Sequence, residues 1–195
     1  MSTPLAIRLI AWAWFISALL LSRTQMLGRL PGLATLGLTL LLTSGLWITY
    51  VRIANFRSWI NALDLRSLVL LHSVRLVGYY FLLLHNRGEL PYAFAVPSGW
   101  GEILIATLVV PVCFLPLSAR HRHRALTIWN VIGFTEIILA CLTATRLALE
   151  NPMALRAFAT LPLSLWPLFL SPVILVTHLI IYQRLQRENS ATSPE

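Results

Sequence analysis

Long apolar runs alternate with short polar stretches along most of the 195-residue chain. Each run is about 20 residues long, the length that a helix needs to cross the roughly 30 Å hydrocarbon core of a bilayer. None shows the strict alternation of a membrane β-strand, and a helix satisfies its backbone hydrogen bonds internally. The pattern predicts an all-α, polytopic transmembrane helical bundle with six spans, near residues 4–22, 31–51, 65–85, 97–117, 125–147 and 162–183.

Composition agrees with this pattern, because 57% of the residues are hydrophobic, only 11% are charged and the mean hydropathy is +0.75. Such a chain is expected in a lipid bilayer. We expect residues 1–187 to form a single transmembrane domain and residues 188–195 to form a disordered C-terminal tail. The first run follows Arg8 and lacks a small-x-small cleavage site after it, so it is interpreted as a retained helix.

The stretch GELPYAFAVPSGWGEILIA, residues 88–106, interrupts the apolar pattern with prolines and glycines. Pro91 and Pro97 each bias the preceding residue toward extended backbone, and Gly99 and Gly101 weaken a helix. We therefore expect a broken or re-entrant segment before the fourth helix, which would begin near Pro97. The alternative is an ordinary loop anchored at the membrane interface by three aromatic residues, Tyr92, Phe94 and Trp100.

All fifteen basic residues are arginines, and there is no lysine. They lie mainly at the ends of the spans, which favours a membrane-orientation signal over nucleic-acid binding. With the N-terminus in the cytoplasm, nine arginines fall inside and five outside, so both termini are expected to be cytoplasmic. The run ARHRHR, residues 119–124, is then predicted as a short cytoplasmic loop that contacts lipid headgroups; a metal or phosphate site is the alternative.

Several kinds of chemistry are excluded by what the sequence lacks. Without a lysine there is no Schiff-base chemistry, and no P-loop, His-Glu-x-x-His or Cys-x-x-Cys motif occurs. Cys113 and Cys141 lie in apolar runs and are expected to be small buried hydrophobic residues. We predict no catalytic residue, and the sequence favours a protein that is not an enzyme.

Polar residues inside the apolar runs are the candidate functional residues. A charged side chain at mid-membrane costs about 2.5 to 3.5 kcal/mol on insertion scales, so such residues are expected to face each other or water. His72 and Arg75 are three residues apart in the third run and share one helix face. The predicted centre, which would bind a small solute or a proton, consists of His72, Arg75, Glu102, Asn130, Glu136 and His178.

Structural roles compete with this interpretation. Glu102 is a candidate for the first turn of a helix that starts near Gly99, where a carboxylate is favourable. Arg75 is a candidate counter-ion for one glutamate, and Asn130 could join two helices by a hydrogen bond. A weak echo between residues 99–108 and 133–142 would pair Glu102 with Glu136, as in the inverted repeats of transporters.

These residues also carry a resemblance. The order His-x-x-Arg-x-x-Gly, Leu-Pro-x-x-Phe-Ala-x-Pro-x-Gly-x-Gly-acid, Asn-x-x-Gly-x-x-acid and a proline-rich last helix with a histidine resembles a family of small, uncharacterised bacterial inner-membrane proteins. The likeness covers roughly residues 66–182. It implies a bacterial inner (cytoplasmic) membrane location and no particular activity. Aspartate is common at both acidic positions of the family, where this chain has glutamate. The matching residues are His72, Arg75, Gly78, Leu90, Pro91, Phe94, Ala95, Pro97, Gly99, Gly101, Glu102, Asn130, Gly133, Glu136, Pro167, Pro172 and His178.

The sequence leaves three functions open, and we favour the first, a small-solute or proton-coupled transporter-like protein. The second is a cofactor protein, with His72 and His178 as axial haem ligands or, together with Glu102 and Glu136, as ligands of a divalent metal. The third is a non-catalytic membrane scaffold subunit whose polar groups lock the bundle. An intramembrane aspartyl protease is disfavoured because the only aspartate, Asp64, lies outside the runs.

Overall fold

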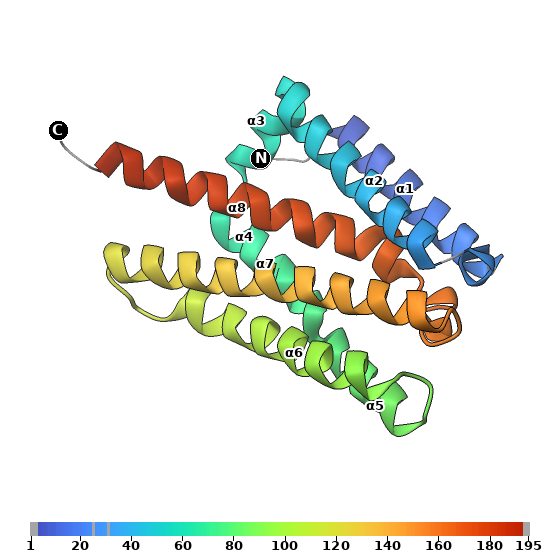
Figure 1. Cartoon of the computed structure of the whole chain (residues 1–195). Helices are drawn as coiled ribbons and strands as arrows, with labels where there is room; N and C mark the ends of the chain where they lie inside the picture. Colours follow the sequence, from blue (N-terminus) through green and yellow to red (C-terminus); the bar gives the residue numbers. More distant parts are fainter. Residues whose placement is uncertain (1–3, 25, 31, 193–195) are drawn as a thin grey trace. The chain divides into compact units, whose positions relative to one another are not determined.

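The computed structural model describes residues 4–24, 26–30 and 32–192, and all regular structure in these ranges is helical (Figure 1). Predictions for residues 1–3, 25, 31 and 193–195 lie outside the described residues. Six helical stretches in the described ranges are long and apolar enough to cross a membrane: Leu5–Arg23, Leu33–Arg52, Leu65–Asn86, Tyr92–Phe114, Ala119–Glu150 and Trp166–Glu188. This confirms the predicted all-α bundle, and the six apolar helices fit an integral membrane protein.

The chain forms two compact units, each built from two segments of sequence. Unit 1 comprises residues 1–63 and 141–173, and unit 2 comprises residues 64–140 and 174–195. The helices α7, Ala119–Glu150, and α8, Ser171–Thr192, each begin in one unit and end in the other. Every residue predicted for the polar centre belongs to unit 2.

Unit 1 contains the helices α1, Leu5–Arg23, α2, Gly32–Arg52, and α3, Ala54–Ala62. It also contains the 3₁₀ turns η1, Met26–Arg29, and η3, Arg156–Ala159, and the π-helical turn η4, Trp166–Leu170. Ala18 of α1, Leu27 of η1 and Leu168 of η4 form its buried apolar cluster. The short helix α3 lies in the stretch between the second and third predicted spans.

The prolines of the last apolar run explain how η4 is held. Pro172 lacks the N–H group that would bond the carbonyl of Leu168, and the Ser171 N–H reaches back to Trp166 instead of Pro167. Two side chains satisfy these carbonyls: Trp14 Nε1 donates to Leu168 O at 3.1 Å, and Thr39 Oγ1 donates to Pro167 O at 3.2 Å. The irregular turn therefore keeps its backbone paired through α1 and α2.

Unit 2 is built from the third and fourth spans and most of the fifth and sixth. The third span is not one regular helix: α4, Leu65–Leu70, passes into the 3₁₀ helix η2, Leu71–Val77, and then into α5, Gly78–Asn86. The fourth span is α6, Tyr92–Phe114. In Figure 1, α6 and α7 run side by side, and Trp129 Nε1 of α7 donates a 3.0 Å hydrogen bond to Ile105 O of α6.

The prediction of a broken or re-entrant segment before the fourth helix is wrong. The helix α6 begins at Tyr92 behind Pro91 and continues through Pro97, Gly99 and Gly101 without interruption. Pro97 lies early in the helix and removes one intrahelical hydrogen bond, which does not end the helix. The chain instead turns at Gly88, whose φ of 73° is a backbone conformation that glycine adopts readily. Glu102 is therefore well inside α6 and not in its first turn.

Two other boundaries differ from the predictions. Residues 119–124, predicted as a loop, form the first turns of α7, so this helix starts earlier than the predicted residue 125. At the other end of the chain, α8 continues to Thr192 and enters the predicted tail at residues 188–195. The prolines of residues 162–172 delay the start of the regular last helix to Ser171.

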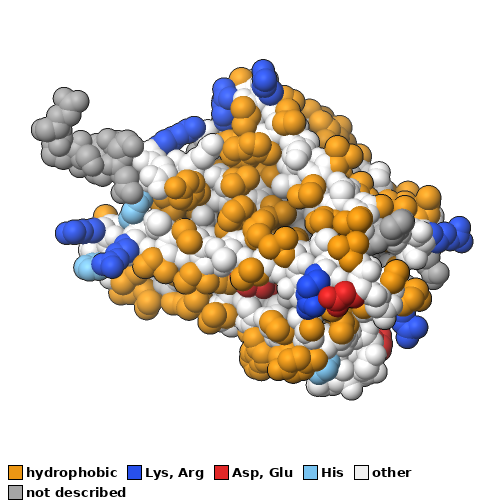
Figure 2. All heavy atoms as spheres, viewed as in Figure 1, with side chains coloured by type: hydrophobic (Ala, Val, Ile, Leu, Met, Phe, Trp, Pro, Cys, Tyr) orange, Lys and Arg blue, Asp and Glu red, His pale blue; other side chains and the backbone are white. Residues whose placement is uncertain are grey.

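Exposed hydrophobic side chains follow the outer faces of the unit 2 helices. Trp100, Leu104 and Val110 on α6 and Leu139 on α7 are each more than half exposed. On the face shown in Figure 2, hydrophobic side chains predominate along these two helices, and basic side chains are visible near the start of α7. A soluble surface would not carry so many exposed apolar residues, whereas contact with lipid requires them.

Candidate functional site

The six residues predicted for the polar centre meet inside unit 2. His72 and Arg75 lie on η2, Glu102 on α6, Asn130 and Glu136 on α7, and His178 on α8. In a 3₁₀ helix, residues three apart project from the same side, so η2 directs His72 and Arg75 together into the unit. Both side chains are completely buried, and those of Glu102, Asn130 and His178 are at most 2% exposed.

Arg75 contacts residues on three other helices of this centre. Its Nε donates to Glu102 Oε2 at 2.5 Å, and its second terminal nitrogen forms an ion pair with Glu136. The remaining terminal nitrogen donates to the carbonyl of Gly133 at 3.0 Å and lies 3.3 Å from His178 Nε2. A planar guanidinium with five donors can reach several acceptors at once, so Arg75 connects η2 to α6, α7 and α8.

Hydrogen-bond partners define the tautomer of His178. Its Nε2 faces the Arg75 guanidinium, which can only donate, so Nε2 accepts and carries no proton. Its Nδ1 then donates to Asn130 Oδ1 at 2.9 Å, and Asn130 Nδ2 donates back to the His178 carbonyl at 3.2 Å. Asn130 thus holds both the ring and the backbone of His178, and it presents Nε2 to Arg75.

Only one of the two ring nitrogens of His72 has a hydrogen-bond partner among the described residues. Thr177 Oγ1 donates to the Ile174 carbonyl at 2.9 Å, so His72 Nε2, at 3.2 Å from the same oxygen, is the donor to Thr177. The other ring nitrogen, Nδ1, is buried without a hydrogen-bond partner. The His72 ring lies against His178, with 4.3 Å between ring centroids, and against the edge of Trp129 at 5.1 Å.

Glycines make room for the centre. A Cβ atom on Gly101 would lie 2.7 Å from Glu136 Cγ, and one on Gly133 would lie 2.8 Å from His178 Cε1. Gly78 and Gly99 bring α5 and α6 together, because a Cβ on Gly99 would come within 3.0 Å of the Gly78 carbonyl. These four glycines allow the backbone approach that polar side chains on neighbouring membrane helices need.

Sequence reasoning missed Thr177, Trp129 and the carbonyl of Gly133 as parts of the centre. Thr177 precedes His178 directly, and threonine is common in apolar helices, so its pattern carries no signal. Gly133 did belong to the matched motif, although the motif cannot show that its carbonyl accepts from Arg75. Trp129 directly precedes Asn130, and nothing in the sequence pattern shows that its ring lies against His72.

Glu136 is the accessible member of the centre. Its side chain is 15% exposed, whereas those of Glu102 and Arg75 are 1% and 0% exposed. The two glutamates therefore differ in environment although both pair with the same arginine. Any exchange of a proton or solute with the surroundings of unit 2 is expected to involve Glu136.

Neither haem nor a divalent metal fits the residues of this centre. A porphyrin held by two axial histidines lies between their rings, and His72 and His178 are in contact, which leaves no room for it. The Arg75 guanidinium already occupies the position between Glu102 and Glu136 where a cation would be held. Within the described residues, no three side chains of histidine, cysteine, aspartate or glutamate are arranged to hold a metal ion.

The Asn130 contact gives a testable prediction. Asn130→Ala leaves buried His178 Nδ1 without its acceptor, and we expect the free energy of unfolding to fall by about 1 kcal/mol, the usual scale for a hydrogen bond between membrane helices. Denaturation with sodium dodecyl sulfate in mixed micelles measures it. The control is Thr107→Ala, since this exposed hydroxyl bonds only carbonyls of its own helix. Equal losses in both variants would contradict the prediction.

Comparison with known proteins identifies a family for most of the chain. No curated protein and no solved structure matches it. Residues 31–186 match a domain of unknown function, DUF8737, and this range includes every residue of the centre. The chain therefore belongs to the family of this domain of unknown function, DUF8737.

Proposed function

We propose that this membrane protein is transporter-like and that its Arg75 centre carries a proton in exchange with a small solute. The observation that carries the proposal is the sharing of one guanidinium by two carboxylates, the buried Glu102 and the partly exposed Glu136. Ionisable groups inside a membrane protein are costly, and they commonly mark proton or solute pathways.

Charge counting supports a proton in the centre. With both glutamates ionised, one arginine leaves a net charge of −1, and His178 is neutral in the tautomer that its partners define. An uncompensated buried charge costs several kcal/mol, so a proton or a cationic group is needed to balance it. One proton on the carboxylate pair gives a neutral centre in which every charge is paired.

The difference between the two glutamates supports a division of roles. Glu102 is almost fully buried and acts as the fixed partner of Arg75. Glu136 is partly exposed and is the group that gains and loses the proton. When the proton leaves Glu136, the negative charge is available to a cationic part of a solute, and the two then occupy the site alternately.

Infrared spectroscopy of the full-length protein in lipid tests this proposal. We expect a carbonyl stretching band of a protonated carboxyl group that shifts in D₂O, disappears as the pH is raised and is absent from Glu136→Gln. The matched control is Glu150→Gln, because Glu150 pairs with Arg146 at 2.8 Å on an exposed helix face and its loss should leave the band unchanged. If the wild-type protein shows no such band at any pH at which it is folded, the proton-carrying role is wrong.

A structural role is the second candidate, and a specific observation favours it. All three nitrogens of Arg75 and both ring nitrogens of His178 have partners, as expected of a network that locks helices together. Such a scaffold predicts that Glu136→Gln lowers the free energy of unfolding and that the wild-type protein shows no titrating carboxyl band. The infrared experiment therefore separates the two roles.

We also propose that both termini face the cytoplasm of a bacterial cell, with the protein in its inner membrane. The excess of arginines at one set of helix ends supports this orientation. It places the starts of α4 and α7 and the end of α6 on the cytoplasmic side.

A further inference from the structure

A second group of charged residues lies at the end of unit 2 where α4 and α7 begin and α6 ends. It surrounds a pocket of about 460 Å³, a size that is ordinary for a small-ligand site. The pocket is lined by Asp64, Leu65, Arg66, Val112, Cys113, Ala119, Arg122, His123, Leu126 and Glu188. None of these residues takes part in the Arg75 centre.

Two guanidinium groups in this pocket have no carboxylate partner. Among the described residues, neither Arg66 nor Arg122 forms an ion pair, although Arg122 makes a long 3.4 Å contact to the Leu115 carbonyl. The Nε of Arg122 and the Nε2 of His123 are buried without hydrogen-bond partners. The guanidinium Nε of Arg122 can only donate, and a buried donor without a partner is costly, so it indicates that an acceptor belongs in the pocket.

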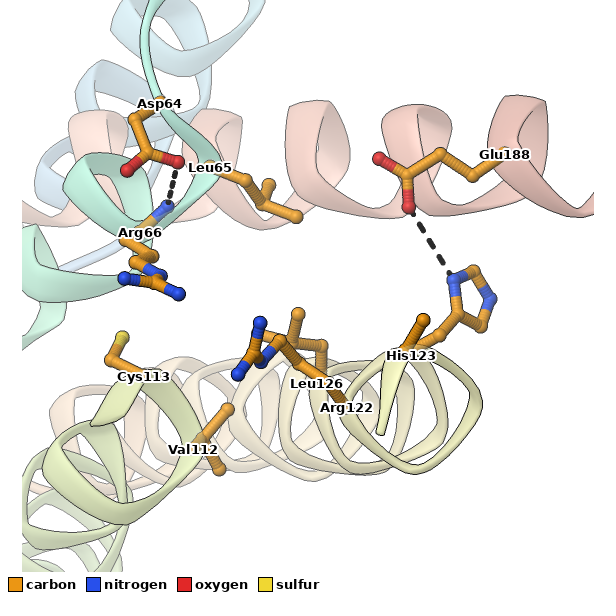
Figure 3. A pocket seen from close by; sticks show the side chains of 10 residues that line it. Asp64, Leu65, Arg66, Val112, Cys113, Arg122, His123, Leu126 and Glu188 are labelled. Carbon is orange, nitrogen blue, oxygen red and sulfur yellow. Dashed lines mark hydrogen bonds and ion pairs between the residues drawn. The ribbon is translucent and has the colours of Figure 1, made fainter. Parts of the chain in front are cut away.

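The acidic residues of the pocket are engaged elsewhere. Glu188 faces His123, with 3.5 Å between its Oε2 and His123 Nδ1. The Asp64 carboxylate accepts from the backbone N–H of Arg66 at 3.2 Å and caps the start of α4. Figure 3 shows the Arg66 and Arg122 guanidinium groups turned toward the space between α4 and α7, whereas the Glu188 and Asp64 carboxylates are directed to these other partners.

We propose that this pocket binds a phosphate anion between Arg66 and Arg122. Arginine forms paired, charge-assisted hydrogen bonds with phosphate oxygens. The flanking Arg120 and Arg124 raise the local positive potential. Leu65, Val112 and Leu126 give the same pocket an apolar wall, which suits a phosphate that is attached to a lipid. Basic pockets between membrane helices bind anionic headgroups in this way.

The test measures binding of soluble, short-chain lipids to the full-length protein in detergent by native mass spectrometry. We expect dioctanoyl phosphatidylglycerol to bind more tightly than zwitterionic dioctanoyl phosphatidylcholine. Arg122→Gln and Arg66→Gln should each weaken phosphatidylglycerol binding about tenfold, because each removes a charge-assisted contact. Arg120→Gln and Arg124→Gln are the matched controls from the same helix, and they should change the Kd less than about twofold.

Competition with inorganic phosphate distinguishes the two sources of the anion. Displacement of the lipid by millimolar phosphate supports a free phosphate site, and lack of displacement supports a lipid headgroup site. Arg66 is exposed, so Arg66→Gln keeps the test valid even if Arg122→Gln lowers the melting temperature. Equal weakening by all four arginine variants, or equal binding of both lipids, would overturn the proposal, because surface charge alone would then explain binding.

Discussion

Arg75→Leu is expected to lower the free energy of unfolding by about 3 to 5 kcal/mol, the largest loss of any single charge removal in the chain. The leucine would leave the buried Glu102 and the partly exposed Glu136 without the guanidinium that both contact. It would also free the carbonyl of Gly133 and the Nε2 of His178. Denaturation with sodium dodecyl sulfate in mixed micelles, followed by tryptophan fluorescence, measures this loss.

Two comparisons make the Arg75 result specific. Arg146→Leu removes an arginine from an exposed pair with Glu150, and such pairs contribute about 0 to 1 kcal/mol. The triple change Arg75→Leu, Glu102→Gln and Glu136→Gln removes all three charges, and it should recover part of the stability lost in Arg75→Leu alone. If Arg75→Leu costs no more than Arg146→Leu, the ion pairs of the centre do not hold unit 2 together.

The members of the centre could be predicted from the sequence because hydrocarbon makes polar residues conspicuous. His72, Arg75, Glu102, Glu136 and His178 each interrupt an apolar run, and a charged group in such a run must find a partner or water. The six spans follow from the same physics, since the length of each run is set by bilayer thickness. The prediction that these side chains meet is confirmed by their contacts with Arg75 and with one another.

The pairing inside the centre could not be predicted. Spacing places His72 and Arg75 on one face, but it does not show that Arg75 contacts both glutamates. Nor does it show that the two histidines are in contact and too close to hold a haem. These features depend on how far each helix is rotated about its own axis, and apolar runs that are hydrophobic all round contain little information on rotation.

The local backbone conformation around the centre could not be predicted from the sequence either. Residues 71–77 form a 3₁₀ helix although they contain neither proline nor glycine, so tertiary contacts of His72 and Arg75 outweigh local preference there. Conversely, the sequence pattern of Gly99 and Gly101 predicts a broken helix. In the structure, both glycines are instead sites of close packing inside the continuous helix α6. Interfaces between membrane helices are enriched in small residues, so a glycine in an apolar run does not by itself predict a helix end.

Gly78→Ala is expected to lower the free energy of unfolding by about 3 kcal/mol, because the new methyl group has no space. Its Cβ would lie 2.9 Å from Glu102 Cβ and 3.0 Å from Ile103 Cγ1, and it would clash with the carbonyl of Gly99. Backbone cannot move aside as a flexible side chain can, so α5 and α6 must separate. That separation pulls Glu102 away from Arg75 and couples the packing defect to the loss of an ion pair.

Gly45→Ala is the matched control for Gly78→Ala, because it makes the same change at a helical glycine of α2 with nothing within 4 Å of its Cβ position. There alanine only removes the conformational freedom of glycine, which should raise the free energy of unfolding by about 0.5 to 1 kcal/mol. Opposite signs in the two variants would show that Gly78 acts through close packing against α6. The same small change for both would mean that the approach of α5 and α6 does not position Glu102, and the geometry of the centre would then need another cause.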